Sequence, residues 1–108
     1  MGHQKALVIS PPDQLSPMMC RAHVTVRGRV QGVAFRYFTK EKANSLGVKG
    51  WVRNLPDGRV ECELEGRVDA VKSLIDLLRE GPRLAKVTGL DVEWLEYSGR
   101  YNDFRIVF

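Results

Sequence analysis

From Arg21 onward, the spacing of hydrophobic positions alternates between a period of two and the helical period of about 3.6. Period-two and β-branched runs predict strands, whereas apolar positions at i, i+3, i+4 and i+7 predict amphipathic helices. The predicted elements are a strand at 23–27, a helix at 34–46, strands at 48–54 and 59–65, a helix from 68 to about 81, a strand at 87–97 and a short strand at 104–108. This β-α-β-β-α-β order with one terminal strand predicts an α+β sandwich, a split βαβ domain with two helices on one face of an antiparallel four- to five-stranded sheet.

Glycine and proline mark the boundaries of several predicted elements. Gly47 follows the first helical pattern and is a natural C-cap. Leu55-Pro56-Asp57-Gly58 has the composition of a tight turn, and Gly66 is expected to end the strand before it. Within 59–65, three apolar positions alternate with glutamates at 61, 63 and 65. We therefore expect this strand to turn one face to the core and an acidic face to water.

The N-terminal 19 residues lack the pattern of the remainder. Ser10-Pro11-Pro12-Asp13-Gln14 is a cluster of residues that interrupt helices and strands. We therefore expect a mobile extension at 1–19 and one domain at 20–108. Met18 and Met19 directly precede the patterned region, which leaves a translation start there as an alternative.

Composition is that of a globular domain, with 44% hydrophobic and 28% charged residues among 108. Seventeen basic and thirteen acidic residues give a net charge of +4, and the basic residues are dispersed rather than clustered. We therefore expect no nucleic-acid partner. No apolar run approaches the roughly 18 residues of a membrane span, and Ala6–Ile9 is too short for a signal-peptide core. These features favour a cytoplasmic protein with no membrane partner.

The two cysteines have no spacing that suggests chemistry. Cys20 and Cys62 form neither a C-x-x-C pair nor a metal-ligand pattern. Cys62 lies on the apolar side of its strand, so we expect a small buried hydrophobic residue rather than a reactive thiol.

The segment from Gly28 to Arg36 is the strongest candidate for a binding site. Two glycines four residues apart follow a strand and precede a helix, and Arg36 falls in the first turn of that helix. Glycines let backbone N–H groups converge, the helix start adds free N–H groups and a positive dipole end, and arginine donates bidentately to phosphate. The candidate phosphate-binding residues are Gly28, Arg29, Val30, Gln31, Gly32, Val33 and Arg36.

Taken singly, these residues have ordinary structural explanations. Two glycines between a strand and a helix are most often a turn, and a lone arginine is most often solvated. Gln31 could be a plain polar loop residue, and Asn54 could belong to the turn that follows it. The glycine spacing does not match a Walker A loop, and no Gly-Lys-Ser/Thr follows. The combination of the glycine loop with Arg36 and Asn54 is more specific than any one of them.

Two segments of the chain resemble the acylphosphatase family. One is Gly28-Arg29-Val30-Gln31-Gly32-Val33-Ala34-Phe35-Arg36, and the other is Gly50-Trp51-Val52-Arg53-Asn54, followed by Asp57-Gly58, Val60-Glu61 and Glu65-Gly66. Between them, Ala43-Asn44-Ser45-Leu46-Gly47-Val48 stands at the spacing that the family shows. The resemblance covers about residues 21–108.

The resemblance implies a small metal-independent hydrolase with a ferredoxin-like fold that cleaves the carboxyl–phosphate bond of acyl phosphates. It implies that Arg36 binds the phosphate, that Asn54 orients the attacking water, and that loop N–H groups complete the phosphate site. It implies no cofactor, and it leaves His3 and His23 outside the chemistry. We expect a monomer whose site accepts a small acyl phosphate, or a phosphate or sulfate ion.

Two other functions fit the same order of elements. RNA-recognition domains share it, but their stacking aromatics stand on the third strand, where this chain has three glutamates. Acylphosphatase-like units also occur within larger carbamoyl-transfer maturation proteins, so a regulatory or scaffold role is the second alternative. Hydrolysis is the function that we expect.

Overall fold

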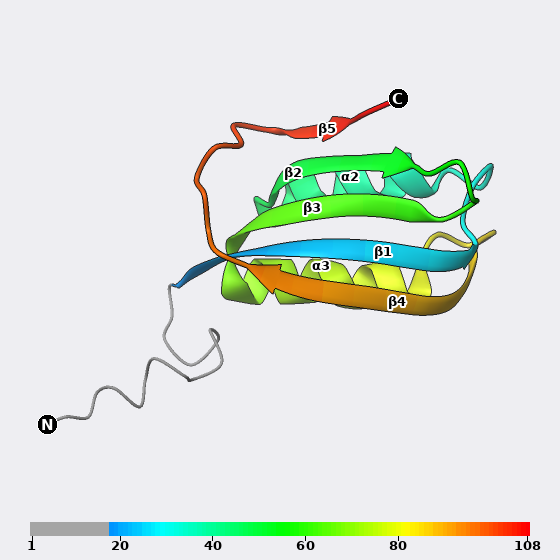
Figure 1. Cartoon of the computed structure of the whole chain (residues 1–108), viewed down its shortest axis with the longest axis horizontal. Helices are drawn as coiled ribbons and strands as arrows, with labels where there is room; N and C mark the ends of the chain where they lie inside the picture. The colour runs from blue at the N-terminus through cyan, green and yellow to red at the C-terminus, as the bar shows by residue number, and fades with distance from the viewer. Residues whose placement is uncertain (1–17) are drawn as a thin grey trace, which may run out of the picture.

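A computed structural model gives the fold and describes residues 18–108. The elements in chain order are β1 (Met19–Arg29), α2 (Phe35–Leu46), β2 (Lys49–Asn54), β3 (Val60–Arg67), α3 (Val68–Glu80), β4 (Lys86–Leu95) and β5 (Phe104–Ile106). The strands form one sheet in the order β4-β1-β3-β2-β5, and both helices pack on the same face of it (Figure 1). The predicted α+β sandwich is confirmed.

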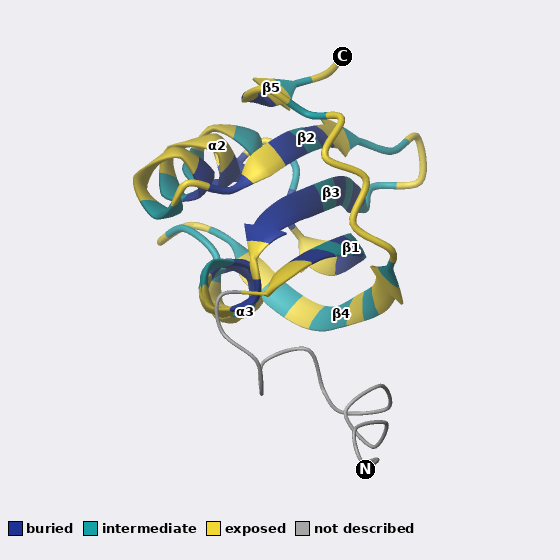
Figure 2. Ribbon diagram, turned by 90° about the vertical axis from the view of Figure 1, so that its left-hand side faces the viewer, coloured by how far each residue is buried: buried dark blue, intermediate teal, exposed yellow. Residues whose placement is uncertain are grey.

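The sheet is mixed rather than wholly antiparallel. β1, β2, β3 and β4 pair antiparallel, as predicted, whereas β5 pairs parallel to β2. The cause is the segment at 96–103, which leaves β4 at one edge of the sheet and enters β5 at the other edge. Figure 2 shows this segment running along the face of the sheet opposite to the helices. We call it the crossover segment.

Several element boundaries differ from those predicted. β1 begins at Met19 rather than His23, because Cys20 and Ala22 continue its buried face although neither is β-branched. β3 continues through Gly66 to Arg67, so this glycine does not end the strand. The main-chain oxygen of Met18 accepts a hydrogen bond of 2.9 Å from the N–H of Val68. Residues 1–17, which we predicted to belong to a mobile extension, lie outside the described residues.

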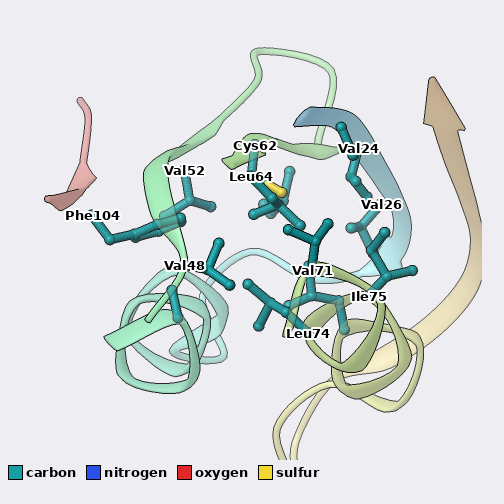
Figure 3. Close-up of a cluster of buried hydrophobic side chains, with 14 of the residues drawn as sticks. Val24, Val26, Val48, Val52, Cys62, Leu64, Val71, Leu74, Ile75 and Phe104 are labelled. Carbon is teal, nitrogen blue, oxygen red and sulfur yellow. The ribbon is translucent and has the colours of Figure 1, made fainter. Parts of the chain in front are cut away.

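The core lies between the helices and the sheet (Figure 3). Cys62 is fully buried there beside Val24, and burial raises the pKa of its thiol. Burial also raises the pKa of Cys20, to about 11. The prediction that Cys62 packs as a small hydrophobic residue is confirmed. No helix in residues 18–108 is long and apolar enough to cross a membrane.

The acidic face of β3 is not exposed to water as expected. The side chains of Glu61 and Glu63 are only 16% and 12% exposed, and that of Glu65 is 2% exposed. Basic side chains of β1 and β2 flank these glutamates, and the crossover segment covers part of the face. Glu61, for example, accepts a hydrogen bond of 2.6 Å from Arg53 and lies 2.7 Å from the Nε2 atom of His23.

Candidate active site

The C-terminal ends of β1 and β2 lie at the same end of the sheet. Antiparallel pairing places Val26 beside Val60 and Val60 beside Asn54, so these residues form one row across the sheet. β1 and β2 flank β3 and therefore run in the same direction, and both end on the right in Figure 1. The 30–34 loop leaves β1 at this end, and α2 starts from it. The loop and Asn54 are therefore brought together.

The side chain of Asn54 points to the helix side of the sheet. Gly50 and Val52 are buried on that side, and residues two apart in a strand share a face. Arg53 points the other way and binds Glu61. Within residues 18–108, the Oδ1 atom of Asn54 is shielded from solvent and has no hydrogen-bond donor. Buried acceptors are almost always satisfied, so this oxygen is a strong candidate for a ligand contact.

Two apolar side chains anchor the loop, and the glycine between them is exposed. Val30 and Val33 are buried in the core, whereas Gly32 is exposed. Gly32 has a φ of 75°, and Ala34, the N-cap of α2, has a φ of 66° and a ψ of 27°. A left-handed alanine is uncommon, and such strain concentrates at functional sites. Alanine seldom adopts this conformation, so its residue type did not predict the strain at Ala34.

The backbone of this segment offers hydrogen-bond donors without acceptors. In the part of the chain that the structure describes, no acceptor binds the N–H groups of residues 30–37, and the first bonded one belongs to Phe38. The first turn of α2 carries no acidic residue, and no side chain caps it. Free N–H groups and an uncompensated positive dipole end are the features that bind phosphate.

Gln31 joins the loop to the turn that follows Asn54. Its Nε2 atom donates to the main-chain oxygens of Leu55, at 2.8 Å, and Arg59, at 2.9 Å. The side chain of Gln31 is therefore occupied in holding the loop against the β2–β3 turn. Its backbone N–H is among those without an acceptor.

Arg36 projects from the first turn of α2 and contacts the C-terminal residue. Its Cζ atom lies 4.9 Å from the centre of the ring of Phe108, and no carboxylate among residues 18–108 pairs with it. β5 places Ile106 beside Val52, so the same parallel register continued by two residues puts Phe108 level with Asn54. Phe108 is a neighbour of the site that we did not predict, although it continues the alternation of Phe104 and Ile106.

Gly28 and Arg29 belong to β1 rather than to the loop. Gly28 has a φ of 125°, and a Cβ atom there would lie 2.1 Å from the main-chain oxygen of Lys86. The glycine therefore permits β1 and β4 to approach closely at an irregular point of their pairing. Arg29 is exposed at the end of the strand. The free N–H groups start at Val30, two residues after Gly28.

The acylphosphatase family model matches residues 22–106. The chain belongs to the acylphosphatase family. It is 56% identical over 90 residues to an acylphosphatase of Pyrobaculum calidifontis, with 82% of each chain covered. It is also similar to the crystal structure of acylphosphatase from Bacillus subtilis, with a TM-score of 0.80, 37% sequence identity, and 84% of this chain and 100% of that chain covered.

A third comparison concerns a much larger protein. The crystal structure of full-length HypF in its phosphate- and nucleotide-bound form is similar to this chain, with a TM-score of 0.74 and 28% identity. The match covers 87% of this chain and 12% of that chain. A unit similar to this chain thus also occurs as a small part of a longer polypeptide.

Proposed function

We propose that this member of a hydrolase family cleaves acyl phosphates at the site formed by residues 30–34, Arg36 and Asn54. One observation carries the proposal: donors without acceptors and a buried acceptor without a donor occupy the same end of the sheet. A phosphoryl group requires the donors, and an attacking water requires the acceptor.

The phosphoryl oxygens are bound by the backbone and by Arg36. The N–H groups of residues 30–37 surround the start of α2, and Val30 and Val33 fix the loop in the core. Arg36 has no competing carboxylate within residues 18–108, so its guanidinium is available for bidentate contacts. Together they stabilise the negative charge on the phosphoryl group in the transition state.

Asn54 aligns the attacking water. Its Oδ1 accepts a hydrogen bond from the water, which directs the oxygen lone pair at phosphorus. Asparagine is not a base near neutral pH, so its contribution is orientation. Because phosphoryl transfer proceeds through a loose transition state, a strongly activated nucleophile is not required.

The bond changes balance without an acid from the protein. Water oxygen bonds to phosphorus as the bond between phosphorus and the bridging oxygen breaks. The acyl group leaves as a carboxylate, and both water protons remain with the phosphate product. The conjugate acid of the leaving group has a pKa of about 4, so the carboxylate departs unprotonated. The products are one carboxylate and one inorganic phosphate.

We propose that positive charge for this reaction comes from Arg36 and the N–H groups rather than from a metal ion. In residues 18–108, no three His, Cys, Asp or Glu side chains gather as metal ligands would. Gly28 and Arg29 remain proposed neighbours of the bound phosphate, with Gly28 acting through the pairing of β1 with β4.

Benzoyl phosphate hydrolysis in excess chelator tests the proposal. Wild type is compared with Arg36→Ala and with Arg79→Ala, an exposed arginine of α3 that serves as a matched control. We expect Arg36→Ala to lose about 10³-fold in kcat/KM and Arg79→Ala to retain wild-type activity. Activity abolished by the chelator contradicts the proposed source of charge. Phosphate binding without hydrolysis favours a regulatory role, and binding of single-stranded RNA at low salt favours the RNA-recognition alternative.

A further inference from the structure

We propose that Glu65 is a positioning residue for Arg36. Its buried carboxylate fastens the crossover segment to the sheet, and that segment sets β5 and Phe108 against the guanidinium. This inference rests on the proposed function, because it concerns how the phosphate-binding arginine is held.

Glu65 is the most deeply buried of the three glutamates of β3, with 2% of its side chain exposed. Its Oε2 atom accepts three hydrogen bonds: 2.5 Å from the N–H of Ser98, 2.7 Å from the hydroxyl of Ser98 and 3.1 Å from the N–H of Gly99. Three donors that converge on one ionised oxygen form strong, geometrically selective contacts. The crossover segment is therefore fixed to β3 near its start.

A second set of contacts holds the later part of the crossover segment. The hydroxyl of Tyr101 donates to Glu63 at 2.5 Å and accepts from the indole N–H of Trp51 at 3.2 Å. Further on, the main-chain oxygen of Asp103 accepts a 2.9 Å bond from Gly50. These contacts lead the chain across the sheet face to the outer edge of β2 (Figure 2).

β5 is short. It comprises three residues, Phe104–Ile106, at the edge of the sheet, and within residues 18–108 it pairs with β2 alone. Phe104 is buried in the core and β5 also packs against α2, whereas the N–H of Val107, beyond the strand, donates to Val52 at 2.8 Å. Because the pairing is brief, the path of the crossover segment should contribute to where the end of β5 and Phe108 lie.

Phe108 connects the position of β5 to Arg36, because its ring contacts the guanidinium. Phe108 as a residue is 91% exposed and stands two positions beyond β5, and the Cζ atom of Arg36 lies 4.9 Å from the centre of its ring. A cation above an aromatic face loses one of its preferred positions when the ring moves. Release of the crossover segment should therefore let the guanidinium sample more orientations and should weaken phosphate binding.

The test is a double-mutant cycle between Glu65 and Phe108. Inhibition by inorganic phosphate and KM for benzoyl phosphate are measured for wild type, Glu65→Leu, Phe108→Ala and the double variant. Glu65→Gln, which retains an acceptor oxygen, is the conservative variant. Ile75 is buried in α3 and lies outside the crossover segment. Ile75→Val and Ile75→Ala serve as controls that lower stability by a small and a larger amount without changing that segment.

We expect Phe108→Ala and Glu65→Leu each to raise the phosphate inhibition constant about two- to fivefold, the range of an exposed cation–π contact. The double variant should be no worse than Phe108→Ala alone, and Glu65→Gln should recover at least half of the effect. The Ile75 variants should lower the melting temperature and leave the inhibition constant unchanged.

Two results overturn the inference. One is an inhibition constant that is unchanged in Glu65→Leu or in Phe108→Ala, and the other is effects that multiply in the double variant. Failure of the proposed function gives a different result. In that case wild type does not hydrolyse benzoyl phosphate, or Arg36→Ala hydrolyses it as fast as wild type.

Discussion

The Nε2 atom of Gln31 donates a hydrogen bond of 2.8 Å to the main-chain oxygen of Leu55. This contact joins the loop that offers N–H groups to the residue directly after Asn54. The loop and Asn54 come from different strands, so their relative position depends on contacts of this kind. Hydrolysis requires the phosphorus atom and the attacking water to be held in a fixed relative position, so the hydrogen bond of Gln31 should matter for the rate.

We predict that Gln31→Leu lowers kcat for benzoyl phosphate about 10- to 100-fold, because small displacements between reacting groups are costly. The free energy of unfolding should fall by about 1–3 kcal/mol, since two carbonyl oxygens lose a donor. Steady-state kinetics and urea unfolding measure the two effects. A kcat within twofold of wild type contradicts the linking role of Gln31.

Gly28 and Gly32 should differ in their tolerance of a side chain. Gly28→Ala would place a Cβ atom 2.1 Å from the main-chain oxygen of Lys86, so it should cost more than about 3 kcal/mol. At Gly32 no atom lies within 4 Å of the added Cβ, and only the backbone conformation, with a φ of 75°, opposes alanine. Gly32→Ala should cost no more than about 1 kcal/mol, because the lower chain entropy of alanine in the unfolded state offsets part of the strain. Urea unfolding that ranks the two variants in the reverse order refutes this explanation.

Ala34 offers a prediction of the opposite sign. Its φ of 66° is unfavourable for alanine by about 1–2 kcal/mol, while glycine loses about 0.5–1 kcal/mol more chain entropy on folding. Ala34→Gly should therefore raise the free energy of unfolding by up to about 1 kcal/mol. A loss of stability in the same urea experiment would show that the methyl group makes a favourable contact.

The order of elements was predictable because each element carries its own local pattern. α2 ends at Leu46 with Gly47 in the left-handed conformation, as the sequence indicated, and α3 spans its apolar stripe. The parallel pairing of β5 was not predictable, because alternation at Phe104 and Ile106 indicates a strand but not its neighbour. The covered face of β3 was missed for the same reason: its cover comes from residues more than thirty positions later.

The site could be predicted where residue type determines the chemistry. Glycines, an arginine in a first helical turn and an asparagine before a turn all have restricted chemical uses, and the structure places Arg36 and Asn54 at one end of the sheet. The contact between Phe108 and Arg36 depends on tertiary structure, and so does the strain at Ala34. Gly28 looked like part of the loop because its spacing from Gly32 does not distinguish a turn from a close approach of strands.

The carboxylate of Glu65 should make folding sensitive to acid. Burial on its own raises the pKa of this group, but hydrogen bonds from Ser98 and Gly99 and the charge of Arg21 outweigh burial and lower the pKa. A carboxyl whose pKa is lower in the folded state contributes stability that is complete above its ordinary pKa, near 4.5, and is lost as pH falls through the folded value.

Urea unfolding of wild type and Glu65→Gln between pH 7 and pH 3 measures this contribution. The difference in the free energy of unfolding should be largest near neutral pH and should shrink as the pH falls. Glu61, whose pKa is also lowered, should leave a residual acid dependence in both proteins. A difference that stays constant or grows in acid contradicts a charged role for Glu65.

Asn54 carries the central claim, that one group binds the phosphate while another aligns the water. Its Oδ1 is a buried acceptor without a donor in residues 18–108, so Asn54→Ala should not lower the free energy of unfolding by more than about 0.5 kcal/mol. The direct measurement is kcat for benzoyl phosphate together with the inhibition constant of inorganic phosphate in this variant. We predict a kcat at least about 100-fold lower and an inhibition constant within about threefold of wild type. A well-folded Asn54→Ala protein with normal kcat, or one whose loss lies wholly in phosphate binding, contradicts the account.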